Sequence, residues 1–153
     1  MTAHLMATGE SRFEAQEHRD LARGLARVDE FIERAPELGS EALWARLHDT
    51  LRWLDREVRA HMAWEDRWLY PQLDEIAGTP WATRSARVEH RQIETMIATL
   101  EADSVRLLDH ATPHACAGVV GHLSAIRAVL ATHVEREERL LLPLLDDASR
   151  SPR

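Results

Sequence analysis

Two halves of this chain carry the same histidines and glutamates at the same spacing, and this repeat constrains the fold more than any other feature. In each half a histidine is followed 43 residues later by a second histidine and, four residues further on, by a glutamate. The second set lies 72 positions after the first, and the six residues are His18, His61, Glu65, His90, His133 and Glu137. The repeat predicts two half-sites that face each other across a pseudo-two-fold axis, and hence a two-metal centre.

Composition and local signals predict long helices. Only six of the 153 residues are glycine and six are proline, which favours helix. Helix starts are indicated by a capping box of Ser11 with Glu14, by Ser40, and by the pairs Thr79-Pro80 and Thr112-Pro113. The predicted helices cover residues 11–34, 40–75, 80–109 and 113–147. No segment alternates with period two, so no sheet is expected.

Each predicted helix has an apolar stripe, and the six candidate ligands lie within these stripes. The second stripe continues past its glutamate to Trp68, and the fourth continues to Leu140 and Leu144. Such inward-facing stripes are typical of an all-α, up-down-up-down four-helix bundle. At about 1.5 Å per residue, the ligands lie within a few ångströms of the same height. We expect one domain over residues 1–153, with a bundle core at about 11–147 and the six side chains inside it.

The buried carboxylates favour a metal over the alternatives. A core histidine is usually a hydrogen-bonded structural residue, and a histidine–glutamate pair one turn apart is often a surface pair. Here two carboxylates share apolar stripes with four imidazoles, and burying an ionised carboxylate without compensation costs several kcal/mol. Mutual ion pairing is possible, but buried ion pairs often gain little over apolar packing. Two coordinated cations offset the cost better and explain the duplication.

The ligand types narrow the choice of metal. Imidazole mixed with carboxylate suits iron, manganese or zinc, whereas calcium and magnesium prefer oxygen and structural zinc usually takes cysteine. Two histidines and one glutamate per half cannot complete six-coordination, even if both glutamates bridge. The open positions suit water, an oxo or hydroxo bridge, dioxygen or peroxide. Because the set is rich in histidine, it favours binding of dioxygen or peroxide over C–H oxidation.

The doubled motif, a histidine and then His-x-x-x-Glu in each half, resembles the hemerythrin-like (HHE cation-binding) family. The resemblance covers about residues 11–147, and the segments after the two glutamates, 65–71 and 137–143, are similar to that family as well. It implies a four-helix bundle around a non-haem di-iron site with two bridging carboxylates. It also implies dioxygen binding, sensing or peroxide-related chemistry.

The chain departs from the oxygen-carrying members of that family in two places. Those members have a second histidine one turn after the third-helix histidine, where this chain has Glu94. They also end the last motif with aspartate, where this chain has Glu137. Glu94 is either a fifth donor or proton acceptor, or an exposed helix carboxylate, because Ile93 fits the apolar stripe better. These departures argue against reversible dioxygen carriage of the usual kind.

Other residues of reactive types are expected outside the site. Glu17 and Glu89 precede ligands in sequence, so their side chains turn about 100° away and favour solvated faces. Tyr70 lies off the apolar stripe, and Cys116 lies far from the ligand level. Trp64 and Trp68 either wall a ligand pocket or pack as ordinary aromatic residues. Five histidines have no partner in the repeat and favour surface or capping positions: His4, His48, His110, His114 and His122.

Charge and composition also bear on partners and compartment. A net charge of −7 argues against a nucleic-acid partner. The single cysteine cannot form an internal disulfide, which fits a reducing compartment. No secretory pattern opens the sequence, and no stretch of 18 apolar residues predicts a membrane span. We expect a soluble, cytoplasmic protein whose partner is a small ligand such as O2, NO or peroxide. The pattern leaves oligomeric state and partner proteins open.

Three functions remain open at this point. The favoured one is a non-enzymatic, non-haem di-iron protein that binds O2, NO or peroxide. The second is a catalase- or peroxidase-like di-iron enzyme, or one that reduces NO, at the same site. The third is a scaffold that holds iron or zinc without turnover. Ligand spacing defines the centre but does not choose its reactivity.

Overall fold

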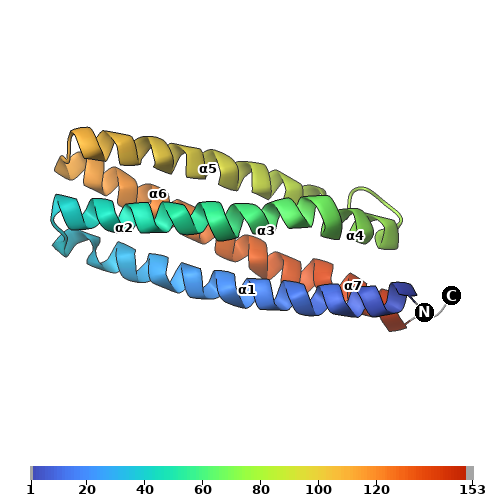
Figure 1. Cartoon of the computed structure of the whole chain (residues 1–153). Helices are drawn as coiled ribbons and strands as arrows, with labels where there is room; N and C mark the ends of the chain where they lie inside the picture. Colours follow the sequence, from blue (N-terminus) through green and yellow to red (C-terminus); the bar gives the residue numbers. More distant parts are fainter. Residues whose placement is uncertain (1, 151–153) are drawn as a thin grey trace.

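The computed structural model describes residues 2–150, with side chains from residue 12 to residue 148, and over that range the chain forms four antiparallel helical rods (Figure 1). The first rod is α1 (Thr2–Arg34) and the third is α5 (Arg84–Asp109). The second rod consists of α2 (Ser40–Trp53), α3 (Arg59–Trp64) and α4 (Tyr70–Ala77), and the fourth of α6 (Pro113–Arg136) and α7 (Leu142–Arg150). No strand occurs within residues 2–150. The predicted all-α, up-down-up-down bundle is confirmed.

Short π-helical segments join the pieces of the second and fourth rods. They are η2 (Leu54–Val58), η3 (Glu65–Leu69) and η4 (Glu137–Leu141). At the end of η3 the Tyr70 N–H donates to the carbonyl of Glu65, and at the end of η4 the Leu142 N–H donates to the carbonyl of Glu137. Each π turn holds one residue more than an α turn, so later side chains rotate by about 100° relative to a continuous α-helix. The π turns at η3 and η4 belong to the repeat as well.

The π turns shift the apolar stripe by one position. Trp68 and Leu140 are exposed, at 52% and 63%, so their predicted inward positions are wrong. Leu69 and Leu141 are buried in their place, and Leu144 is partly buried. The prediction fails here because it continued the 3.6-residue period through both glutamates.

The first predicted helix start is wrong, whereas the second is confirmed at residue 40 with a different N-cap residue. Helix α1 begins at Thr2, so Ser11 lies inside it rather than at its N-cap, and Glu14 takes no part in a capping box. Helix α2 begins at Ser40 itself, with Gly39 in the N-cap position. Ser11 has no capping role because α1 already begins at Thr2.

The other two starts differ from each other. Helix α5 begins at Arg84 rather than at residue 80, because Asp74 accepts hydrogen bonds from the Thr83 N–H and hydroxyl at 3.1 and 3.0 Å and holds residues 79–83 as a turn. Helix α6 starts as predicted: the Thr112 hydroxyl accepts from the Ala115 N–H at 3.1 Å. The end of the bundle near α4 therefore has a longer connection than the sequence predicted.

Two apolar clusters enclose the level at which the predicted ligands lie. The larger one fills the bundle toward the turns at residues 35–39 and 110–112, and the smaller one includes Leu73, Ala86 and Leu145. In the larger cluster α1 approaches α2 closely at Gly24, where a Cβ atom would lie 2.1 Å from the Trp53 ring. The cluster of buried histidines and glutamates lies between the two apolar clusters, which exclude water from both sides.

One helical stretch, Pro113–Ala148, is long and apolar enough to cross a membrane by length and composition. A core helix of a soluble protein passes the same test. This stretch packs against α1 and α5 and carries the buried His133 and Glu137. The expectation that nothing spans a membrane therefore does not follow from composition alone, and the cytoplasmic location stays a prediction.

Candidate metal centre

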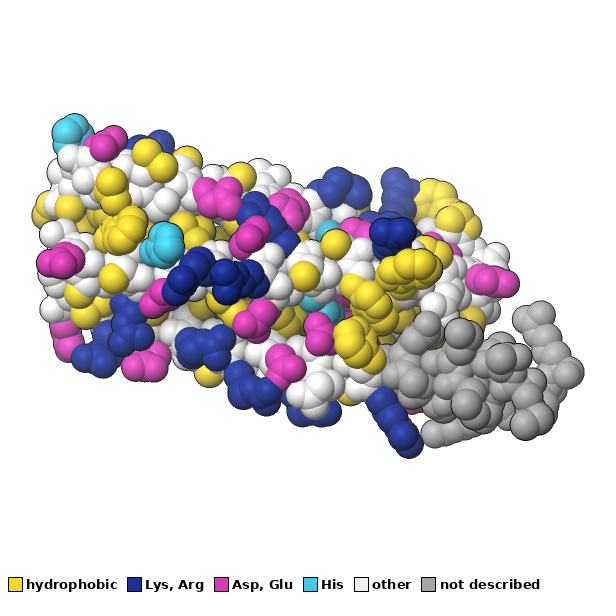
Figure 2. All heavy atoms as spheres, in the orientation of Figure 1, with side chains coloured by type: hydrophobic (Ala, Val, Ile, Leu, Met, Phe, Trp, Pro, Cys, Tyr) yellow, Lys and Arg dark blue, Asp and Glu magenta, His cyan; other side chains and the backbone are white. Residues whose placement is uncertain are grey.

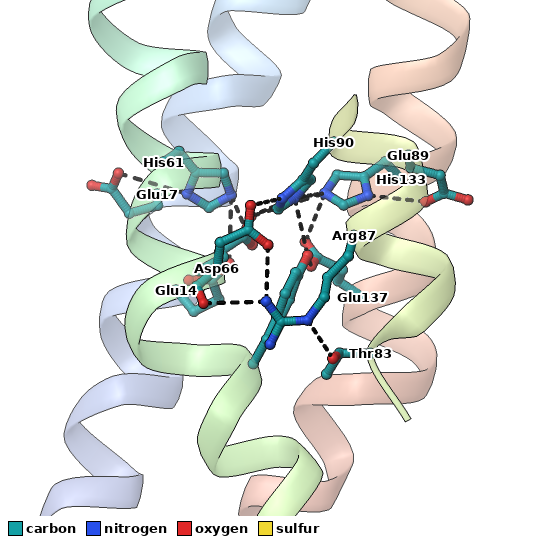
Figure 3. Close-up of polar contacts among 12 residues, drawn as sticks. Glu14, Glu17, His61, Asp66, Thr83, Arg87, Glu89, His90, His133 and Glu137 are labelled. Atoms are coloured by element: carbon teal, nitrogen blue, oxygen red, sulfur yellow. Dashed lines mark hydrogen bonds and ion pairs between the residues drawn. The ribbon is translucent and has the colours of Figure 1, made fainter. Parts of the chain in front are cut away.

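All six predicted ligands are buried and converge at one level of the bundle. Figure 3 shows four of them, His61, His90, His133 and Glu137. Each rod contributes at least one of the six, and none is more than 3% exposed. They are His18 of α1, His61 of α3, Glu65 of η3, His90 of α5, His133 of α6 and Glu137 of η4. The side chains point toward one another across the space between the rods rather than toward solvent. The sequence thus located these six residues correctly in the bundle.

A seventh buried group, Glu14 of α1, joins the cluster. Its side chain is completely buried, and its Oε1 lies 2.8 Å from Nε2 of His18 and 3.5 Å from Nε2 of His61. The sequence prediction missed it because the position equivalent to Glu14 in the second half is Ala86, so the repeat did not mark it. The available signal was its place one helical turn before His18 on the same stripe.

The donor atoms fall into two overlapping groups. Site A contains Glu14, His18, His61, Glu65 and Glu137, and site B contains Glu65, His90, His133 and Glu137. Within each group the donor atoms all lie within 4.8 Å of one another. Glu65 and Glu137 belong to both groups, which is the position that a bridging carboxylate needs.

Distances between the donors agree with coordination of common ions. Two donors held about 2.1 Å from one ion at a right angle lie about 3.0 Å from each other. In site B the Nε2 atoms of His90 and His133 are 3.1 Å apart. In site A, Nε2 of His61 lies 3.1 Å from Oε1 of Glu65. The cluster therefore has the spacing of a set of metal ligands.

Several of these buried atoms have no hydrogen-bond partner among the described residues. They include both carboxylate oxygens of Glu14 and Glu65 and the Nε2 atoms of His18 and His61. The atoms are close enough to form ion pairs, yet their lone pairs and protons are not aligned as donors and acceptors. Buried polar atoms without a partner are costly, and cations held among them would remove that cost. The buried histidine and glutamate cluster can thus hold metal ions.

Among themselves, the buried groups partly neutralise one another. Burial alone lowers the pKa of His18, but the carboxylates around it, Glu137 first, raise that pKa to about 12. Burial alone raises the pKa of Glu65, but the surrounding histidines, His133 first, hold it well below its usual value. At Glu14 burial dominates and raises the pKa to about 8. Metal binding must displace such protons, since ligands bind in their deprotonated forms.

An outer set of carboxylates contacts the other nitrogen, Nδ1, of the histidines. Nδ1 of His133 lies 3.0 Å from Glu89, and Nδ1 of His90 lies 3.1 Å from Asp66. The remaining pairs are His18 with Glu138 at 3.3 Å and His61 with Glu17 at 3.9 Å. A carboxylate on the outer nitrogen fixes the tautomer and directs Nε2 to the metal.

The outer carboxylates also follow the 72-residue repeat: Glu17 and Glu89 occupy equivalent positions in the two halves, and so do Asp66 and Glu138. The predicted solvated position is wrong for Glu89, whose side chain is only 15% exposed. Its carboxylate turns away from the adjacent ligand on its own helix and reaches the histidine of the neighbouring helix α6. The signal in the sequence was the recurrence of an acid directly beside each matched ligand.

Tyr70 is a further buried group that the sequence prediction placed outside the site. Its hydroxyl donates a short hydrogen bond to Glu137 and lies 3.1 Å from Nε2 of His90. Its ring stacks on the imidazole of His90, with centroids 5.2 Å apart. Burial first, then the carboxylates of Glu65 and Glu137, raise the pKa of Tyr70, so it stays protonated. The π turn η3 rotates Tyr70 into the site.

The remaining candidates lie outside the cluster. Glu94 is exposed and forms an ion pair with Arg59 at 3.0 Å. It therefore behaves as an exposed helix carboxylate and not as a fifth metal donor. Trp64 is half-buried and contacts Phe13, with ring centroids 4.9 Å apart. His48, His110, His114 and His122 are exposed, and the side chain of His4 lies outside the described residues.

The fold and the site together define a helical-bundle metal-binding domain. The family model for the hemerythrin HHE cation binding domain matches residues 11–146, which is nearly the whole chain. The chain therefore belongs to the hemerythrin HHE cation-binding family. Searches of the curated proteins and of the solved structures found no match.

Proposed function

We propose that the protein is a non-haem di-iron protein that binds dioxygen or a related small ligand, NO or peroxide, between its four rods. One ion is held at site A and one at site B, with Glu65 and Glu137 as shared ligands. The observation that supports this proposal is the pair of overlapping donor groups, with two buried carboxylates common to both. Iron, when bound, supplies one-electron redox chemistry and free coordination positions for such a ligand.

The two sites favour different roles. Site A has five donor residues, whereas site B has four and lies beside the hydroxyl of Tyr70. The hydroxyl is a hydrogen-bond donor held in a buried, apolar surrounding that includes Leu69 and Leu73. Site B is therefore the better place for an oxygen-containing ligand, to which Tyr70 would redirect the single proton that it otherwise donates to Glu137.

Metal analysis with an optical spectrum tests the proposal. Protein purified from its natural host should contain two iron ions per chain, and the reduced protein exposed to dioxygen without other oxidants should develop a reversible charge-transfer band. His61→Ala should lose iron, whereas His48→Ala, which removes an exposed histidine of α2, should keep it. Zinc in place of iron would support a metal-binding scaffold instead, and irreversible oxidation without an adduct would exclude dioxygen carriage.

A second candidate, a peroxide-consuming di-iron enzyme, is favoured by one observation. The protonated Tyr70 phenol contacts both Glu137 and His90, so it would be placed to supply a proton to a peroxide held at site B. Peroxide turnover that falls sharply in Tyr70→Phe and vanishes in His61→Ala would support it. Turnover no faster than that of free iron would rule it out.

A further inference from the structure

A cavity of about 660 Å³ opens between α1 and the second rod, next to one of the candidate metal ligands. Its volume is typical of small-molecule sites. Phe13 and Trp64 line one part of it, Arg27 and Arg56 line another, and His61 lies between. Figure 2 shows this face, with arginine side chains over its middle and hydrophobic side chains gathered toward the end that holds α4.

His61 has the most distant outer carboxylate of the four buried histidines. Its Nδ1 atom, like that of His90, has no hydrogen-bond partner among the described residues, and its side chain is only 1% exposed. The nearest outer carboxylate, Glu17, lies 3.9 Å away, whereas the other three histidines have theirs at 3.0–3.3 Å. Both His61 and Glu17 line the cavity, so a ligand there can accept the hydrogen bond that Glu17 is too far away to take.

The lining has three carboxylates and three arginines, so its formal charge is balanced, but two of the arginines lack an ion-pair partner among the described side chains. Asp20 forms an ion pair with Arg23, and Glu57 accepts a hydrogen bond from the Trp53 indole at 3.0 Å. Arg27 and Arg56 form no ion pair with any residue whose side chain is described. The cavity thus offers two free guanidinium groups to an anion, and guanidinium groups bind phosphate well.

The spacing of these features selects an elongated ligand. Arg56 and Trp64 are eight residues apart on the second rod, a rise of about 12 Å. Inorganic phosphate cannot contact both ends, but a mononucleotide with a flat heteroaromatic ring can. We infer that the cavity binds a flavin-type mononucleotide. Its ring packs against Phe13 and Trp64, its phosphate lies at Arg27 and Arg56, and a polar oxygen accepts from Nδ1 of His61.

Titration of flavin mononucleotide with the full chain tests this inference, with flavin fluorescence as the readout. Binding should be saturable, and riboflavin, which lacks the phosphate, should bind at least about tenfold more weakly. Arg27→Ala combined with Arg56→Ala should cause a similar loss, while Arg46→Ala, an exposed arginine of α2 outside this cavity, should cause none. All three arginines are exposed, so these variants should keep the fold.

The binding needs no metal, so the metal-free chain separates this inference from the proposed function. In that form, the ligand should also shift the NMR signal of the His61 imidazole nitrogens. Absence of saturable binding of both flavin mononucleotide and nicotinamide mononucleotide up to about 1 mM would overturn the inference. Equal affinity for riboflavin, or an unchanged affinity in the double arginine variant, would overturn it as well.

Discussion

The two halves of the centre share their six matched ligands but differ at the positions where the repeat breaks. Site A has Glu14 where the second half has Ala86, and Tyr70 enters site B where the other half has Leu142. Site A gains a carboxylate and site B gains a phenol, although both residues come from the first half of the sequence. The small side chain of Ala86 lies in the same apolar cluster as the Tyr70 ring, so the two differences are linked.

The matched residues are the candidate metal donors that the two sites have in common, and the unmatched residues are what distinguishes one site from the other. The unmatched residues fill site A more completely and leave site B with a hydrogen-bond donor in place of a ligand. A centre built on a symmetric repeat thereby becomes asymmetric through two positions at which the halves differ.

Loss of a shared ligand should have the largest effect, because it damages both sites at once. In Glu65→Gln the side chain keeps its shape but loses the charge that four histidines face. We expect the metal content after reconstitution to fall from two ions per chain to fewer than one. Glu94→Gln, which changes an exposed carboxylate, should retain two ions. Two tightly bound ions in Glu65→Gln would show that it is not shared.

Glu14 offers a way to damage one half only. Glu14→Gln should weaken metal binding at site A by about 10–100-fold and leave site B filled, so that about one ion per chain remains. Metal analysis at limiting metal, together with the fold measured by circular dichroism, checks this outcome. Equal loss from both sites would show that the two positions depend on each other more than the donor sets suggest.

The double variant Ala86→Glu with Tyr70→Leu sharpens the same comparison. It gives site B the carboxylate and apolar residue that site A has. If the asymmetry arises from these positions, site B should then bind metal about as tightly as site A and should bind azide or NO more weakly. A site B that keeps its small-ligand affinity would show that the phenol is not what distinguishes it.

Removal of the Tyr70 hydroxyl alone should have a smaller effect. Tyr70→Phe keeps the ring that stacks on His90 but removes the donor to Glu137. Two ions should remain bound, and the affinity for azide or NO should fall by about fivefold, since one buried hydrogen bond contributes about 1 kcal/mol. Loss of an ion in this variant would instead assign the phenol to the ligand set.

The outer carboxylates allow a graded test within one repeat pair. Glu89→Gln removes a contact of 3.0 Å to His133, whereas Glu17→Gln removes one of 3.9 Å to His61. Metal affinity should fall by about tenfold in the first variant and by less in the second. A larger loss in Glu17→Gln would show that it moves closer to His61 once metal is bound.

The repeat made the fold and the positions of the six candidate ligands in the bundle predictable from the sequence. A duplicated His, His-x-x-x-Glu pattern on apolar stripes requires helices of matched length and brings the ligands to one height. A search for matched positions, however, passes over Glu14, whose counterpart is Ala86. The repeat therefore predicts the residues that the two halves share but not those at which they differ.

The other missed residues depend on geometry that spacing does not reveal. Tyr70 reaches the site because a π turn adds one residue after Glu65, and an apolar stripe read at 3.6 residues per turn does not include that step. Glu89 contacts His133 on another helix. The rotation of its side chain away from His90 on its own helix therefore did not predict a solvated position. Both errors come from treating each helix as regular and isolated.

A third break in the repeat lies away from the metal centre and should have the smallest effect. Asp103 stands where the first half has the buried Phe31, and it is bound by His122 and Arg106. Burial alone raises the pKa of Asp103, but these two partners outweigh it and lower the pKa below its usual value. The contacts of Asp103 with His122 and Arg106 therefore stabilise the fold above the unfolded-state pKa of about 4, and this contribution disappears as pH falls through the lower folded-state pKa.

Asp103→Asn should lower the free energy of unfolding by about 1 kcal/mol at pH 7 and by less at pH 3, with metal content unchanged. Urea unfolding at the two pH values would measure this difference. An equal loss at both pH values would show that Asp103 acts by packing rather than by charge.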